Sequence, residues 1–200
     1  MKIIVSRSPL LKESELRYQP MVIRVNEFTE KSAKEFSQAM AMTSNTGQAV
    51  IPVIIDSYGG EVYSLMHMIS EIQSSLLPVM TIVQGKAMSC GAVLLSFGAE
   101  GMRYAAPTAT VMIHDVASGA MGKVEDLKAK TKEASRLNKQ IYSMMDRNCG
   151  KPDGFFWDKI QSKSRADWYL TSKKAKKHNI INHIRIPVMK VNIGVSISIK

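Results

Sequence analysis

A nearly continuous apolar run, VIPVIID at residues 50–56, places the strongest constraint on how this chain can fold. A run of this kind is typical of a strand that is buried on both faces of a parallel sheet. The turn Ser57-Tyr58-Gly59-Gly60 follows, and apolar residues at three- and four-residue steps from Leu65 to Leu76 then predict a helix. Because parallel strands need a crossover between them, this order predicts an α/β architecture.

The order of apolar run, turn and helical pattern recurs along the chain. Further strands are predicted at residues 21–25, 79–83, 102–105 and 108–113, and further helices after Thr29, from Ser89 to about Phe97, from Phe155 to Gln161 and from Thr171 to His178. The C-terminal residues alternate between apolar and polar with period two, which predicts an edge strand or hairpin. We expect one domain over residues 21–184, an N-terminal arm at 1–20 and a basic strand or tail at 185–200.

A long charged helix is predicted over residues 123–148. Its apolar stripe is thin and consists of Val124, Leu127, Thr131, Ala134, Leu137, Ile141 and Met145. Such a stripe is too narrow to pack along its whole length against a single compact domain. We expect this helix to project as a handle and to pack against a partner subunit.

The composition excludes several classes of protein. Lysine and arginine number 27 against 17 acidic residues, a net charge of +10, but no known nucleic-acid-binding module accompanies this charge, so we interpret it as a solvated basic surface. Two cysteines are too few for a disulfide framework, and no apolar run reaches the roughly 20 residues of a membrane span. The N-terminus also lacks the pattern of a signal peptide, so we expect a cytoplasmic protein with no membrane contact.

Reactive or polar groups stand at three predicted strand ends, where α/β sheets collect their sites. Gly59 and Gly60 allow a close approach of the backbone to a ligand, or form an ordinary turn. Ser89, in KAMSCGA, either caps a helix or is an exposed nucleophile. His114 ends an apolar strand and has the chemistry of the base that a serine nucleophile requires.

The carboxylate that would orient such a histidine stays open among Asp56, Asp115 and Asp167. Asp56 precedes the glycine turn. Asp115 follows the histidine directly, and strand alternation directs it to the opposite face. Asp167 stands just before a predicted helix, where a surface or capping role is the alternative.

Four segments together resemble the ClpP family, the proteolytic subunits of ATP-dependent Clp proteases: DSYGGEV at 56–62, GKAMSCGAVLL at 85–95, RYAAPTATVMIHD at 103–115 and DWYLTSKKAKKHNII at 167–181. The resemblance covers about residues 22–184 and implies an α/β, crotonase-like fold with a repeated β-β-α core and a projecting handle helix. It implies Ser89 as nucleophile, His114 as general base and Asp167 as the orienting carboxylate. The backbone N–H groups of Gly60 and Cys90 would form the oxyanion hole.

The resemblance also implies an oligomeric assembly and an enzymatic activity. Members of the family form two stacked seven-membered rings, a tetradecamer, that enclose the active sites, and a Clp-family AAA+ ATPase feeds unfolded polypeptide to them. The implied activity is therefore that of a serine endopeptidase, with an N-terminal axial loop. Three departures stand out: Tyr58 replaces a usual proline, Ala166 replaces an arginine that often precedes the catalytic aspartate, and residues 149–154 look inserted.

Other functions remain open alternatives. They are a catalytically silent scaffold or regulatory subunit of the same fold, an acyl-CoA enzyme that uses the same N–H pair for a thioester, and a basic nucleic-acid-binding protein. A Ser-Lys mechanism through Lys86 and a thiol mechanism through Cys90 are disfavoured because His114 and Asp167 stand in matching contexts. The remaining histidines, His67, His178 and His183, lack neighbours at ligand spacing, so we expect neither a metal nor a cofactor.

Overall fold

The computed structural model describes residues 20–116 and 121–189. Strands and helices alternate along these residues, and their bounds are β1 Ile23–Val25, α1 Glu30–Ser44, β2 Ile51–Ser57, α2 Val62–Ser74, β3 Val79–Met88, α3 Cys90–Ser96, β4 Arg103–Ala105, β5 Thr110–Ile113, α4 Val124–Asn148, α5 Phe155–Gln161, β6 Trp168–Thr171, α6 Ser172–Lys177 and β7 His183–Ile184. The predicted helices at 123–148 and 155–161 are confirmed to within one residue at each end.

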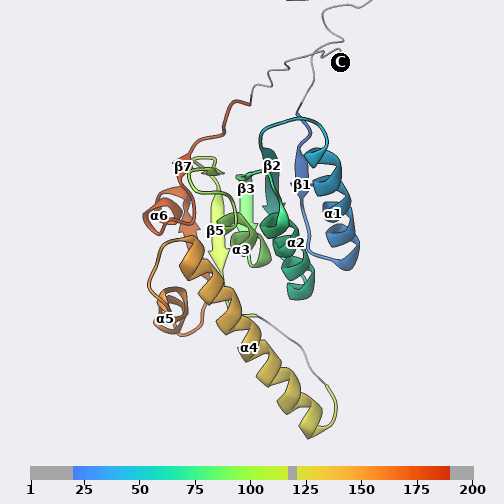
Figure 1. Cartoon of the computed structure of the whole chain (residues 1–200). Helices are drawn as coiled ribbons and strands as arrows, with labels where there is room; N and C mark the ends of the chain where they lie inside the picture. The colour runs from blue at the N-terminus through green and yellow to red at the C-terminus, as the bar shows by residue number, and fades with distance from the viewer. Residues whose placement is uncertain (1–19, 117–120, 190–200) are drawn as a thin grey trace, which may run out of the picture.

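The strands form one sheet in the order β1-β2-β3-β4-β7; β5 also pairs with β3, and β6 pairs with β5. All pairs are parallel except β5 with β6. The ten residues of β3 organise the sheet, because residues 81–83 pair with β4 and residues 86–88 pair with β5. The predicted α/β class with parallel strand pairs is confirmed. Helices α1, α2 and α3 lie next to one another on this sheet (Figure 1).

Local sequence accounts for the elements that carry the site. The Thr29 hydroxyl accepts the amide hydrogen of Ser32, and the Ser32 hydroxyl accepts that of Thr29, so a reciprocal cap starts α1, the helix predicted to follow Thr29. The strand β2 is buried at six of its seven positions, as a continuous apolar run requires. The exposed position is Asp56, one of the candidate carboxylates.

The structure differs from the predicted secondary structure at the end of β3, at β6 and at the end of α2. The strand expected at 79–83 continues through Gly85 to Met88, because residues 86–88 find a partner in β5. Strand β6 was not predicted, since four residues that alternate between buried and exposed give little signal before a helix. Leu76 was expected on the apolar stripe of α2, but the helix ends at Ser74 and the Leu76 side chain is fully exposed.

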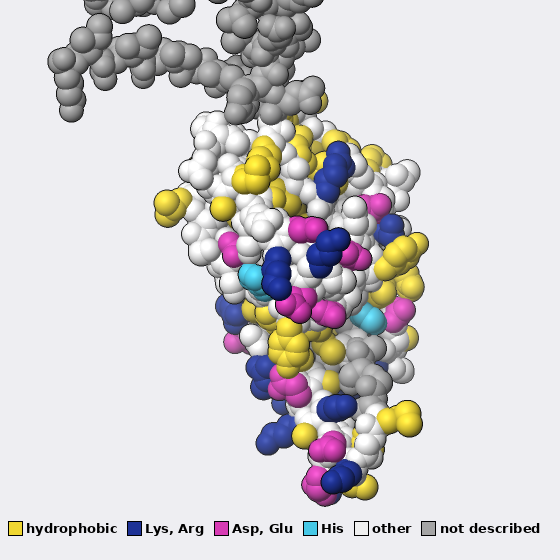
Figure 2. Space-filling model, turned by 90° about the vertical axis from the view of Figure 1, so that its right-hand side faces the viewer, with side chains coloured by type: hydrophobic (Ala, Val, Ile, Leu, Met, Phe, Trp, Pro, Cys, Tyr) yellow, Lys and Arg dark blue, Asp and Glu magenta, His cyan; other side chains and the backbone are white. Residues whose placement is uncertain are grey.

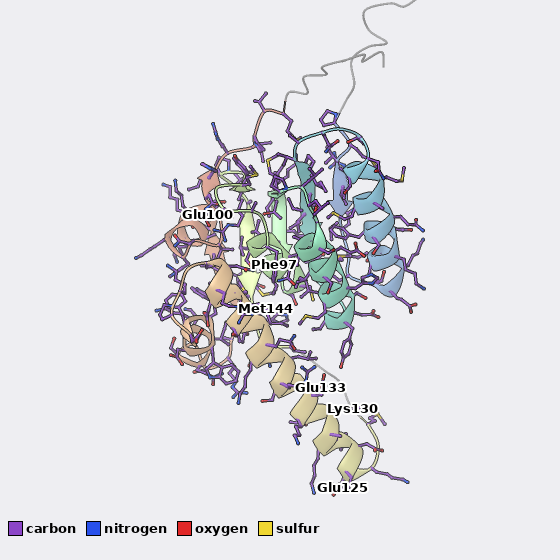
Figure 3. All side chains as sticks on the ribbon, viewed as in Figure 1. Phe97, Glu100, Glu125, Lys130, Glu133 and Met144 are labelled. Atoms are coloured by element: carbon purple, nitrogen blue, oxygen red, sulfur yellow. The ribbon has the colours of Figure 1, made fainter. Side chains whose placement is uncertain are left out.

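The long helix α4 leaves the body of the molecule and projects from it (Figure 1). Its C-terminal half is buried through side chains that include Leu137, Ile141 and Met145, whereas Val124 at the other end is 65% exposed. Figure 3 places Glu125, Lys130 and Glu133 along the projecting part and Met144 where the helix meets the body. Within one chain, therefore, only the C-terminal half of the apolar stripe is buried.

The ends of the chain leave two predictions only partly described. The N-terminal arm lies outside the described residues except for Pro20, and so does the tail from residue 190 onward. Residues 185–189 form no strand, and Ile186 and Val188 are exposed there, so the alternating pattern does not produce an edge strand over these residues. In the described ranges, 20–116 and 121–189, none of the helices is both long and apolar enough to span a bilayer.

Charged side chains of both signs share the surface. On the face drawn in Figure 2, Lys and Arg side chains are interspersed with Asp and Glu over both the body and the projecting part. That face is not a basic patch of the kind that binds nucleic acid through its phosphates.

Candidate active site

Ser89 stands at the sharp junction between β3 and α3. Its backbone has φ 54° and ψ −121°, a conformation that non-glycine residues rarely adopt and that is strained by about 1–3 kcal/mol. The Ser89 amide donates to the carbonyl of Met112 at 2.8 Å, and the Ser89 carbonyl accepts the amide of Ala92 at 3.0 Å. The side chain makes no capping hydrogen bond to α3, so its hydroxyl is available to another partner.

That partner is His114. Met88 of β3 pairs with Met112 of β5, so the residues just beyond the two strand ends lie at the same edge of the sheet. The Nε2 atom of His114 is 2.8 Å from the Oγ atom of Ser89, within hydrogen-bond distance. The parallel register of β3 and β5 therefore brings together two residues that are 25 positions apart.

The structure distinguishes between the three candidate carboxylates, because only one of them lies close to the His114 ring. Asp167 directly precedes β6, whose Trp168 pairs with Ile113 in the antiparallel ladder, so Asp167 lies opposite His114. Its Oδ1 atom is 3.6 Å from the other ring nitrogen, Nδ1 of His114. Neither of the other two carboxylates is engaged with the histidine.

The other carboxylates have partners of their own. Asp115 accepts a hydrogen bond from the Tyr142 hydroxyl at 2.9 Å, and its Oδ2 atom lies 3.9 Å from Nη1 of Arg165. Burial and the neighbouring Asp115 charge raise the pKa of Tyr142, so this hydroxyl stays protonated. Asp56 accepts hydrogen bonds from both the amide and the ammonium group of Lys86. Geometry thus favours Asp167 where the sequence left a choice.

The glycine turn lies directly against Ser89. Gly59 and Gly60 have φ angles of +109° and +149°, which residues with a side chain rarely adopt. A Cβ atom on Gly59 would lie 2.6 Å from Cβ of Ser89, and one on Gly60 would collide with the backbone of Phe28. The turn therefore packs too closely for any other residue type.

Cys90 follows Ser89 and links the elbow to the same turn. Its thiol donates to the carbonyl of Gly60 at 3.2 Å. Burial is the largest cause that raises the pKa of this thiol, to about 11, so the thiol is protonated at neutral pH. A protonated, buried thiol is a poor nucleophile, which argues against a mechanism through Cys90.

A pocket of about 230 Å³ opens beside these residues. Apart from Ser89 and His114, its lining is mostly apolar and includes Val62, Leu65, Val93, Val116 and Ile141. A cavity of this character accepts an uncharged side chain beside the serine hydroxyl. It gives the arrangement both a reactive group and a place for part of a substrate.

Comparison with known proteins agrees with this geometry. A statistical model of the Clp protease family matches residues 10–187. The chain belongs to the Clp protease family. A Bacteroides fragilis protein named ATP-dependent Clp protease proteolytic subunit is 33% identical over 136 residues, which cover 68% of this chain and 64% of that protein. A Bacteroides thetaiotaomicron protein of the same name is 34% identical over 136 residues, 68% of this chain and 60% of the relative.

The match to these Clp protease subunits spans less than two thirds of their length. The family match, by contrast, begins before β1 and ends after β7, so it contains the segments that form the site described above. The α/β fold with its parallel sheet is therefore consistent with membership of the Clp protease family.

Sequence reasoning did not single out some residues of this Clp protease site. Tyr142 lines the pocket and donates a hydrogen bond to Asp115, but the apolar stripe predicted for this helix includes its neighbour Ile141 and not Tyr142. The contacts of Lys86 with Asp56 and with the Tyr58 ring were also not anticipated. The one sequence signal for these contacts was the pair of opposite charges, Asp56 and Lys86, near the ends of two neighbouring strands.

Over residues 20–116 and 121–189, no three or more His, Cys, Asp or Glu side chains form a group that could hold a metal ion. His67 lies near Ser37 and Glu71, while His183 contacts the carbonyl of Gly101.

Proposed function

We propose that this chain is a serine endopeptidase subunit of the Clp protease type, with Ser89, His114 and Asp167 as its catalytic residues. The observation that carries the proposal is the 2.8 Å distance between Oγ of Ser89 and Nε2 of His114 at the mouth of an apolar pocket. A serine hydroxyl needs a neighbouring base to become nucleophilic, and this base has a carboxylate on its far nitrogen.

In the first half of the reaction, Ser89 Oγ attacks the carbonyl carbon of the scissile peptide bond. His114 Nε2 takes the hydroxyl proton as the C–O bond forms, and Asp167 stabilises the resulting imidazolium. His114 then donates that proton to the leaving nitrogen as the C–N bond breaks. The products of this half are an ester on Ser89 and a free amine.

The negative oxygen of the tetrahedral intermediate would be bound by the backbone N–H groups of Gly60 and Cys90. Cys90 begins α3, where the first amides of a helix have no partner within the helix. Loss of one such donor in a comparable hydrolase raises the barrier by about 2.7–4 kcal/mol. The close packing of the glycine turn on Ser89 supports this assignment.

In the second half, water attacks the ester carbon while His114 Nε2 accepts a proton from it. The new tetrahedral intermediate collapses, the bond to Ser89 Oγ breaks, and His114 returns the proton to the serine. The acid product leaves, and the enzyme is restored. No metal or cofactor is required for any of these steps.

We further propose that the chain acts in a chamber made of two stacked seven-membered rings, in the cytoplasm, on unfolded polypeptide delivered by a Clp-family AAA+ ATPase. The names of the relatives, which describe proteolytic subunits of an ATP-dependent protease, support this proposal. The half-used apolar stripe of α4 supports the role of residues 123–148 as a handle against a partner subunit. Residues 1–20 would then form the axial loop, 21–184 the peptidase domain and 185–200 a basic tail.

The test combines a covalent probe, a peptide assay and particle mass. A fluorophosphonate should label the wild type at Ser89, and Ser89→Ala should lose the label and about 10⁴–10⁶ of the peptidase kcat while the particle mass stays the same. Ser96→Ala is the matched control, because Ser96 lies at the other end of the same helix. Its buried hydroxyl donates to the carbonyl of Val93, and Ser96 itself does not line the pocket.

The same experiment separates the alternative functions. An assembled particle in which Ser89 is never labelled would indicate a silent scaffold, for which the 3.6 Å gap between His114 and Asp167 is the favouring observation. Labelling that acyl-CoA blocks, without peptide turnover, would indicate an acyl-CoA enzyme. Either outcome would overturn the proposed peptidase.

A further inference from the structure

A lysine next to the catalytic elbow contacts the loop that carries the glycine turn. Nζ of Lys86 lies 4.4 Å from the centre of the Tyr58 ring, a cation–π distance. The same Nζ donates to Oδ1 of Asp56 at 3.1 Å. Tyr58 directly precedes Gly59 and Gly60, and Lys86 lies three residues before Ser89. One ammonium group therefore connects the ends of two neighbouring strands that both lead into the site.

The backbone of β2 and β3 also brings Asp56 and Lys86 together. Between the pairs Ile55–Val83 and Ser57–Ala87, one residue of β2 faces three residues of β3, so the ladder is interrupted at Asp56. The Asp56 carboxylate accepts the Lys86 amide at 3.2 Å and takes the place of a ladder acceptor. Gly85 leaves room for it, since a Cβ atom there would lie 3.0 Å from Oδ1 of Asp56. Asp56 and Lys86 are thus fixed to each other through backbone and side chain.

Tyr58 needs a contact of this kind. Its side chain is 74% exposed, so apolar packing holds it only weakly. The two glycines that follow have wide conformational freedom. Fixing them in one backbone conformation for catalysis therefore costs a large amount of conformational entropy. On the far side of the turn, the Cys90 thiol holds the carbonyl of Gly60, and the Gly59 amide donates to the Ser57 hydroxyl at 3.0 Å. Within residues 20–116 and 121–189, the Tyr58–Lys86 contact is the one that restrains the exposed side of the turn.

We propose that Lys86 is a positioning residue that, through Asp56 and Tyr58, holds the glycine turn in the geometry in which the Gly60 amide can bind the oxyanion. This inference rests on the proposed peptidase function and adds to it a residue outside the triad. Lys86 acts through the turn and does not take the serine proton, because its ammonium group is bound to Asp56 and lies over the Tyr58 ring.

The central variant is Lys86→Met, which keeps an unbranched side chain of similar length and removes the charge. Because the lysine and aspartate side chains are 25% and 47% exposed, the contacts are worth less than a fully buried pair. We expect kcat to fall about 5- to 20-fold with KM changed less than twofold, since the oxyanion forms only after substrate has bound. Affinity for a peptide aldehyde, whose adduct with serine resembles the intermediate, should fall by the same factor.

Three further variants make the test specific. Lys86→Arg retains a cation and should recover most of the kcat that Lys86→Met loses. Lys34→Met is the matched control, because it removes an exposed lysine from a 2.7 Å pair with Glu30 on α1, far from the pocket. Tyr58→Leu should lower kcat like Lys86→Met, and the double variant should be no worse than either single variant if both act through one contact.

Hydrogen exchange measured by mass spectrometry gives a readout that does not depend on activity. The segment 57–61 should exchange faster in Lys86→Met than in wild type or Lys34→Met. Unchanged exchange would overturn the proposal whatever the kinetics, and so would faster exchange with unchanged kcat. If the wild type itself neither cleaves peptides nor is labelled at Ser89, the proposed function fails and the positioning role fails with it, whereas normal wild-type activity with unchanged Lys86→Met kinetics overturns the role of Lys86 alone.

Discussion

Gly59→Ala tests whether the glycine turn and the catalytic elbow are in direct contact. A Cβ atom at this position would lie 2.6 Å from Cβ and 3.1 Å from Oγ of Ser89. Carbon atoms at rest are about 3.5–4 Å apart, so the turn or the elbow has to move by about 1 Å. A misplacement of about 1 Å at a reacting group lowers the rate about 100-fold, which corresponds to about 2.7 kcal/mol of transition-state stabilisation.

Gly101→Ala provides the matched control for this experiment. Gly101 also has a positive φ, +76°, but a Cβ atom there would have nothing within 4 Å. Both substitutions place alanine in an unfavourable backbone conformation, a penalty of about 1–2 kcal/mol, and should lower the melting temperature by about 2–8 °C. Only Gly59→Ala should lower kcat/KM for a fluorogenic peptide about 100-fold. Activity of Gly59→Ala within twofold of Gly101→Ala would refute the close packing of turn on serine.

Other consequences of the structure can be measured separately. Asp167→Asn should lower kcat about 10⁴-fold at saturating peptide because the His114 tautomer is no longer fixed; a loss below tenfold would exclude the proposed orienting role. The apolar pocket predicts that peptides with Leu or Met before the scissile bond have a kcat/KM at least about 10-fold above those with Asp or Lys there, and equal values would contradict it. Since burial raises the pKa of Cys90 from about 9 to about 11, the thiol stabilises the fold below pH 9, and this contribution is lost as the pH rises toward 11. Iodoacetamide at pH 8 should therefore alkylate Cys90 much more slowly in the folded protein than in urea, as mass spectrometry would show. Ile141→Ala should lower the free energy of unfolding by about 2–5 kcal/mol in urea titrations, whereas Met42→Ala, exposed on α1, should change it by at most about 0.5 kcal/mol.

Much of the fold could be predicted from the sequence because the pattern of each element is local. The buried run at 50–56 and the capping residue Thr29 set the positions of β2 and α1 within a residue or two. The same holds for α4, whose charged surface and thin stripe predicted a long helix. In the candidate site, His114 could be named because it follows the apolar run at 108–113, and Ser89 because it stands at the start of the helix predicted from Ser89 to about Phe97.

Elements without a strong local pattern escaped prediction. Strand β6 has four residues, and its existence depends on the edge that β5 offers to it. The extension of β3 to Met88 likewise depends on pairing with residues 110–112. Hydrogen bonds between strands join residues far apart in the chain, so no window of sequence around residues 86 or 168 contains the information.

The amino-acid sequence by itself determined which residues have the chemistry for the site: a serine and a histidine at strand ends, two adjacent glycines and several carboxylates. Residue chemistry left the orienting carboxylate open and the family resemblance implied Asp167; the tertiary structure places Asp167, rather than Asp56 or Asp115, beside His114. It also decided that Lys86 lies over Tyr58. The physical reason is that residue type and periodicity are properties of short segments, whereas the partner of a side chain is set by the register and direction of strands that meet only when the sheet forms.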